Sequence, residues 1–135
     1  MSDNMDYFDK EIWETWANNN YDDFKSLKNG AKLAILLPNT DNLIILEKGN
    51  KISVEIDDRY SFDFPFAEIG FKFNDNSVEK ILNDKTLKTF ERLTSNEEIG
   101  ILSFVKEDIL IEYGYSLFLR KFGFEIKNNC SCGCC

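Results

Sequence analysis

The chain has 135 residues, of which 43% are hydrophobic and 30% charged, and its formal net charge is −8 at pH 7. This length suits one domain with a real core, and the composition argues against a disordered chain or a membrane protein. The acidic surface repels phosphate, so nucleic acid is not expected as a partner. The start lacks the basic and apolar stretches of a secretory signal, and no apolar run is long enough for a transmembrane segment. We therefore expect a cytoplasmic protein.

The first stretch, residues 6–28, has apolar residues at three- and four-residue spacing, which predicts an amphipathic helix. The run Asn18-Asn19-Asn20 weakens it, because short amides compete for backbone hydrogen bonds. We predict one broken helix or two short ones, ended by Asn29-Gly30.

Three strands are predicted next. Ala31–Leu37 is a continuous apolar run, Leu43–Leu46 follows a cluster of turn formers, and Lys51–Asp57 alternates apolar and polar residues. Together they predict an antiparallel meander.

Aromatic residues dominate residues 60–73. The two-residue spacing of Phe62, Phe64 and Phe66 predicts that these rings share one strand face, and Pro65 makes this segment an edge strand or a crossing. A short strand is predicted at Phe71–Phe73.

The rest of the chain predicts helices at residues 77–82 and 85–93, a buried strand at Ile99–Val105, and a final helix at Ile109–Phe122. Asp108 is the expected cap of that helix and Gly123 its end. Gly114 lies in its middle at a cost of about 1 kcal/mol relative to Ala, which indicates close packing or approach of a ligand.

This order of elements resembles the sterol carrier protein type 2 family, over roughly residues 31–123. The resemblance is carried by the two-strand unit at residues 43–54, by residues 67–73 running into the helix at 77–82, and by the closing strand and helix. It implies a single α+β domain with a mixed, mostly antiparallel sheet of about five strands covered by helices. We place this lipid-carrier-like domain at residues 1–127 and a cysteine-rich tail at residues 128–135.

The resemblance also implies an apolar cavity between the sheet and the C-terminal helix, able to hold a lipid or a fatty acyl chain. The expected lining comes from the last strand and helix and, opposite them, from the aromatic segment. These candidates are Phe104, Ile109, Tyr113, Leu117 and Phe118, with Phe62, Phe64 and Phe66. The alternative is a filled core, since aromatic stripes at helical or strand spacing usually pack against one another.

Most catalytic chemistry has no support in this sequence. The chain contains no histidine, which excludes His-dependent triads and His-based metal sites. No phosphate-binding glycine motif occurs. The adjacent carboxylates Asp22-Asp23, Asp57-Asp58 and Glu97-Glu98 are expected to be solvated surface residues. We therefore expect a protein that is not an enzyme.

All four cysteines lie at the C-terminus, at Cys130, Cys132, Cys134 and Cys135. Thiolates at this spacing can bind a thiophilic ion such as Zn²⁺ or Cu(I). Disulfide exchange or sulfur transfer, lipidation of the terminal cysteines, and an inert tail are the alternatives.

The leading hypothesis is a binding or carrier protein for an apolar small molecule, with a thiol tail that binds metal. The alternative is a protein-interaction or accessory module that delivers metal, sulfur or thiol redox chemistry to a protein partner through the tail.

Overall fold

The computed structural model describes residues 9–38, 40–62, 66–74, 77–84 and 86–123. Phe64 and the four tail cysteines, which are among the predicted ligand-binding and metal-binding residues, lie outside these ranges.

The N-terminal helix is interrupted where the sequence predicts it. Helix α1 covers Lys10–Asn19, with Asp9 as its cap, and a 3₁₀ turn follows at Tyr21–Phe24. The side chain of Asn20 bonds back to the Trp16 carbonyl at 2.9 Å. This local hydrogen bonding is the physical reason for the break.

Five strands form one mixed sheet in the order β3-β2-β1-β4-β5. Their bounds are Lys32–Leu36 for β1, Asn42–Lys48 for β2, Ile52–Asp58 for β3, Ile69–Lys72 for β4 and Gly100–Ser103 for β5. The first three strands are antiparallel neighbours, which confirms the predicted meander. Strand β4 pairs with β1 in parallel, and β5 pairs with β4 in antiparallel orientation.

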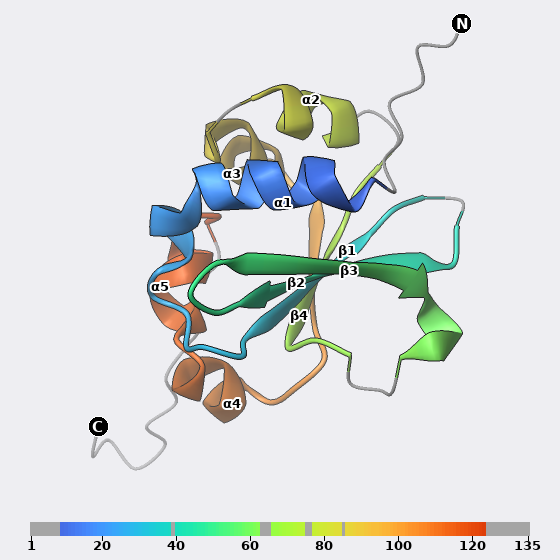
Figure 1. Ribbon diagram of the computed structural model, residues 1–135. Helices are drawn as coiled ribbons and strands as arrows, with labels where there is room; N and C mark the ends of the chain where they lie inside the picture. Colours follow the sequence, from blue (N-terminus) through green and yellow to red (C-terminus); the bar gives the residue numbers. More distant parts are fainter. Residues whose placement is uncertain (1–8, 39, 63–65, 75–76, 85, 124–135) are drawn as a thin grey trace, which may run out of the picture.

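The remaining helices are α2 at Ser77–Asn83, α3 at Lys88–Ser95, α4 at Glu107–Glu112 and α5 at Tyr115–Arg120. In Figure 1, helices α1, α2 and α3 lie above the twisted sheet, α5 lies beside it and α4 lies near one end. The fold is therefore a single α+β domain whose sheet has five strands and is covered by helices.

The main core lies between these helices and one face of the sheet. Strands contribute residues such as Ile35 and Phe71, and α1 contributes Trp13; all three are fully buried. The ring of Phe71 lies 4.7 Å from that of Phe90 and 5.3 Å from that of Phe122. The helix-covered face is thus a continuous aromatic core.

Tyr115 links α5 to the sheet through hydrogen bonds. Its hydroxyl lies 2.9 Å from the Lys32 carbonyl oxygen and 3.1 Å from the Glu68 carboxylate, which also accepts the Lys32 N–H at 2.6 Å. Burial, together with the nearby Glu68 charge, raises the pKa of the Tyr115 phenol. The phenol therefore stays protonated as a hydrogen-bond donor.

Two predictions from the second half of the chain are wrong. The sequence predicts a buried strand at Ile99–Val105, but β5 lies at the sheet edge and Leu102 is 41% exposed. The expected continuous helix at 109–122 is two helices, because Gly114 has a φ of 86°. A side chain there would collide with the Ser26 carbonyl, so close packing explains this glycine.

The expected strand of aromatics is also absent from the described residues between β3 and β4. Arg59–Ser61 forms a 3₁₀ turn, and Phe66 lies in the loop before β4. The Asp58 carboxylate accepts the Tyr60 N–H at 2.9 Å and fixes that turn. This local hydrogen bond fixes the turn directly after β3, and Pro65, where the sequence predicts an edge strand or a crossing, lies outside the described residues.

Candidate ligand-binding site

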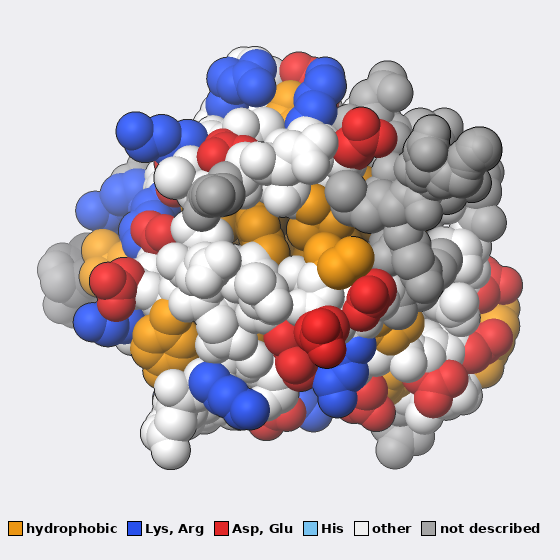
Figure 2. Space-filling model, turned by 45° about the horizontal axis from the view of Figure 1, so that its top comes forward, with side chains coloured by type: hydrophobic (Ala, Val, Ile, Leu, Met, Phe, Trp, Pro, Cys, Tyr) orange, Lys and Arg blue, Asp and Glu red, His pale blue; other side chains and the backbone are white. Residues whose placement is uncertain are grey.

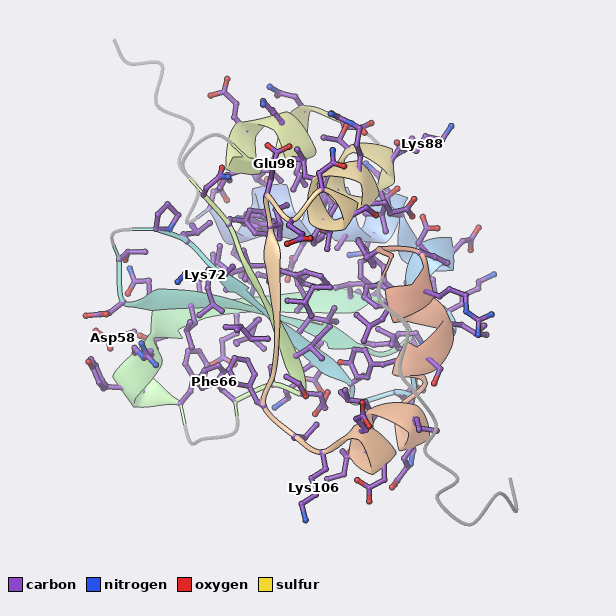
Figure 3. The ribbon with its side chains drawn as sticks, turned by 180° about the vertical axis from the view of Figure 1, so that it is seen from behind. Asp58, Phe66, Lys72, Lys88, Glu98 and Lys106 are labelled. Carbon is purple, nitrogen blue, oxygen red and sulfur yellow. The ribbon has the colours of Figure 1, made fainter. Side chains whose placement is uncertain are left out.

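The face of the sheet opposite the helices carries a second, smaller apolar cluster. Its buried members are Ala34, Leu43, Ile45, Phe66 and Ala67, with Leu36, Phe62 and Phe104 half-buried against them. Figure 3 shows Lys72 and Phe66 on this open side of the sheet, with α5 on the other. The sheet is therefore apolar on both faces, although the helices of the described part of the chain cover only one.

Small residues make a depression in this open face. Ile45, Ala34, Gly70 and Leu102 are consecutive partners across β2, β1, β4 and β5. Side chains at these positions all point to the same face, because partners in a sheet share a face. Ala34 and Gly70 thus form a low floor between the longer Ile45 and Leu102.

Aromatic rings fill the depression. A Cβ atom on Gly70 would come within 2.9 Å of the Phe104 ring and 3.0 Å of Leu36 Cδ1, so the glycine leaves room for that ring. The Phe104 and Phe66 rings meet edge to face with centroids 5.0 Å apart. Gly70 is consequently part of the site through the volume that it leaves open.

The border of the cluster is partly open and carries a cation. Leu102 is 41% exposed, and Lys72, the β4 partner of Leu36, is exposed on the same face. No ion pair involves Lys72 within the described ranges. An apolar strip with one free ammonium group beside it can accept a molecule with an apolar body and a polar or acidic end.

The predicted lining residues are divided between the two faces. Phe62, Phe66 and Phe104 meet on the open face, away from the C-terminal helix beside which the sequence predicts them. Phe118, by contrast, is 1% exposed within the main core, and Tyr113 packs against that core.

The other predicted lining residues lie apart from both groups. Ile109 is half-buried near the start of α4, and Leu117 is 58% exposed on α5. The candidates within the described ranges therefore do not line one shared cavity.

Sequence reasoning missed Gly70, Ala34 and Ile45 as residues of the site. One sequence feature pointed to them: β1 and β2 are apolar at successive positions, which is typical of strands buried on both faces. Their register with Gly70 depends on the parallel pairing of β1 and β4, which local patterns do not reveal.

Two other hollows contain hydrophobic side chains. One of about 330 Å³ lies between α1 and α2 and is lined by Ile12, Trp16 and Leu82, with Glu11, Thr15 and Asn19. Figure 2 faces this side of the molecule and shows hydrophobic side chains within a hollow. The other, of about 390 Å³, surrounds Leu117 on α5.

The carboxylate pairs lie at the surface. Asp22 pairs with Lys25 at 3.0 Å, and Asp23 pairs with Lys121 at 3.4 Å. Asp57, Glu97 and Glu98 are exposed and Asp58 is half-buried. The described part of the chain, which does not include the tail cysteines, holds no group of three potential metal-ligating side chains.

Comparison with known proteins adds little to this geometry. No family model and no curated protein matches the chain. Among solved structures, the chain is similar to "UbiJ-SCP2 Ubiquinone synthesis protein", with 13% identity, coverage of 85% of this chain and 88% of that chain, and a TM-score of 0.47. The name of that protein includes SCP2, the abbreviation of the family that the sequence pattern resembles. Likeness at this level does not bear on function, so function is inferred from the chain's own residues.

No helix within the described ranges is both long enough and apolar enough to cross a bilayer.

Proposed function

We propose that this protein binds an apolar small molecule, of lipid or fatty acyl type, on the open face of the sheet. The observation that carries the proposal is the second apolar cluster, in which Phe66 and Phe104 fill a depression above Ala34 and Gly70. This site replaces the expected one beside α5, where Phe118 and Leu119 are at most 1% exposed and pack in the core.

Binding would exchange one apolar contact for another. The ligand's apolar part takes the place of the Phe104 ring above Gly70 and lies against Leu36 and Leu102. The ligand then covers the apolar surface that the ring had covered, which offsets part of the free-energy cost of moving the ring. Lys72 then lies at the border, where an acidic or polar end of the ligand remains in water.

Two exposed leucines give a matched test. Leu102→Glu places a charge on the proposed strip, and Leu117→Glu places the same charge on α5; both side chains are already more than a third exposed. Titration of the fluorescent fatty acid cis-parinaric acid should show at least a roughly tenfold loss of affinity for Leu102→Glu only, since a buried charge is costly. Equal affinities, or a loss confined to Leu117→Glu, would contradict this site.

A native mass spectrum of the full chain after exposure to a lipid extract provides an independent readout. We expect an adduct of lipid mass on the wild-type protein and on Leu117→Glu. Bare protein under these conditions would count against a carrier role and would favour the alternative of an interaction module.

We propose separately that the tail binds a soft metal ion. The proposal is supported by the placement of all four cysteines within the last six residues, which puts four thiols within reach of one ion. Anaerobic titration with Zn²⁺ and with Cu(I), read by native mass spectrometry, should give a metal adduct on the full chain. The variant with Cys130, Cys132, Cys134 and Cys135 changed to Ser should give none. An adduct on both proteins would place the metal elsewhere, and an adduct on neither would leave disulfide exchange or sulfur transfer as the favoured role.

A further inference from the structure

Helix α1 protects part of the outer edge of β3. The Asn18 side chain donates to the Ile52 carbonyl at 2.9 Å and accepts the Ile52 N–H at 2.8 Å, so it pairs with this residue as a neighbouring strand would. The Glu14 carboxylate accepts the Val54 N–H at 3.1 Å. Strand edges that expose free backbone groups invite pairing with other chains, and these two side chains block that pairing.

The hydrogen bonds from α1 to the outer edge of β3 end at Val54. In an antiparallel pair, alternate residues turn their backbone groups away from the partner strand, and the bonds to Asn18 show that Ile52 is one of them. Ile56, four residues on, therefore also faces outward. Within the described part of the chain, the Val54 carbonyl and both backbone groups of Ile56 have no partner.

A hollow lies beside the part of β3 whose outward backbone groups have no partner among the described residues. A hollow of about 470 Å³ is lined by Val54, Glu55 and Ile56 of β3 and by Lys10 at the start of α1, together with Lys32, Ile45, Glu47 and Ser53. Because α1 begins at Lys10, its side chains do not continue along the edge beyond this point. The stretch from Val54 to Asp58 is called the open edge below.

Carboxylates surround the open edge. Glu55 and Asp57 are exposed on the face of β3 away from the helices, and Asp58 follows them. Two cations, Lys10 from α1 and Lys32 from β1, line the same hollow, and Lys10 lies 3.9 Å from Glu14. A second copy of this chain would bring the same carboxylates together in a protein of net charge −8, which disfavours pairing between copies.

We propose that the open edge binds an extended, basic segment of a partner protein as an added strand. The partner's backbone bonds to Ile56 and to the Val54 carbonyl. Its side chains alternate between the two faces, so Lys or Arg at every second position lies beside Glu55 and Asp57. The residues between them are apolar and contact the half-buried Ile56. Apart from Ile45, which belongs to both, this surface is separate from the apolar cluster, and the proposal does not depend on lipid binding.

Synthetic peptides test the proposal directly. An eight-residue peptide of alternating Lys and Val should bind the full chain, and the same peptide with Glu in place of Lys should not. A Lys/Val peptide with methylated backbone nitrogens keeps the charge but cannot donate hydrogen bonds to the Val54 and Ile56 carbonyls, so its affinity should fall at least about tenfold. Equal binding of the methylated peptide would overturn strand addition, because it would reduce the contact to charge alone.

Two double variants locate the contact. The double variant Glu55→Lys with Asp57→Lys should lower the affinity for the Lys/Val peptide at least about tenfold. The control variant Glu97→Lys with Glu98→Lys makes the same charge change at exposed residues before β5, and its affinity should change little. Equal weakening by both would place binding in the general acidity of the protein and would overturn the proposal.

Amide hydrogen exchange tests whether something other than a partner peptide covers the open edge. The Ile56 amide should exchange rapidly in the free protein and become protected when the Lys/Val peptide is bound. Protection in the free monomer would show that the chain already covers its own edge, and concentration-dependent protection would show a second copy there. Either result would overturn the proposal.

Discussion

The two faces of the sheet are both apolar, but they are packed in different ways. On the helix-covered face, Phe71 is fully buried and contacts rings from α3 and from the segment after α5. On the open face, the buried cluster is small and a residue at its border, Leu102, is 41% exposed. The same strands therefore support a core that stabilises the fold and a smaller apolar surface that is partly exposed to water.

The largest expected difference between the faces is in the cost of removing a ring. Phe71→Ala should lower the free energy of unfolding by about 3–5 kcal/mol, because the surrounding rings cannot close the cavity. Phe66→Ala should cost about 2 kcal/mol, since its cluster has few neighbours and a border open to water. Urea denaturation of both variants measures this difference. Equal losses would show that the open face is packed as tightly as the core.

Glycine substitutions provide the next comparison. Gly114→Ala should lower the free energy of unfolding by at least about 2 kcal/mol. Gly114 has a φ of 86° and faces the Ser26 carbonyl, which cannot move independently of the backbone. Gly70→Ala meets side-chain atoms of Phe104 and Leu36 instead, and these can rotate. Its cost should be about 1 kcal/mol or less, measured by thermal unfolding.

A larger loss for Gly70→Ala than for Gly114→Ala would mean that the Phe104 ring is held rigidly. That result would also weaken the proposal that a ligand displaces this ring.

Acid should affect the helix-covered side before the open face. Hydrogen bonds from Thr89 and Thr86 to the Asp84 carboxylate, which lies before α3, lower its pKa from 3.8 to about 2. A depressed carboxyl pKa contributes stability above pH 3.8, and this contribution is lost as the pH falls from 3.8 towards 2. The effect is small, because the side chain is largely in water.

The protection of α3 amides, measured relative to the intrinsic exchange rate at each pH, should decrease on acidification in the wild type. In Asp84→Asn, which cannot titrate, the decrease should be smaller, while the protection of β1 and β2 amides behaves alike in both proteins. An unchanged pH dependence in the variant would show that Asp84 does not hold the start of α3.

Several elements could be predicted because their determinants are local. The alternation of Ile52, Val54 and Ile56 predicted β3, and the Asn18–Asn20 run predicted the break after α1. Phe62, Phe66 and Phe104 do meet, but on the face of the sheet away from the C-terminal helix. Of the aromatics expected on one strand face, Phe62 and Phe66 lie outside any strand, because Asp58 starts a 3₁₀ turn after β3.

Other features depended on contacts between distant segments. The apolar composition of β5 indicated burial, but burial depends on whether another element covers the strand, and β5 is the last strand of the sheet. Gly114 was compatible with a helix interior, and only the approach of Ser26 shows why the helix must break there.

The sequence by itself determined the α+β class, the antiparallel meander and the acidic character of the surface, because periodicity and charge are properties of neighbouring residues. The tertiary structure decided which apolar face lacks helices, how Ala34 and Gly70 align into a depression, and where α1 stops protecting β3. These features depend on the parallel pairing of β1 with β4 and on the helix packing, which bring together residues far apart in the chain.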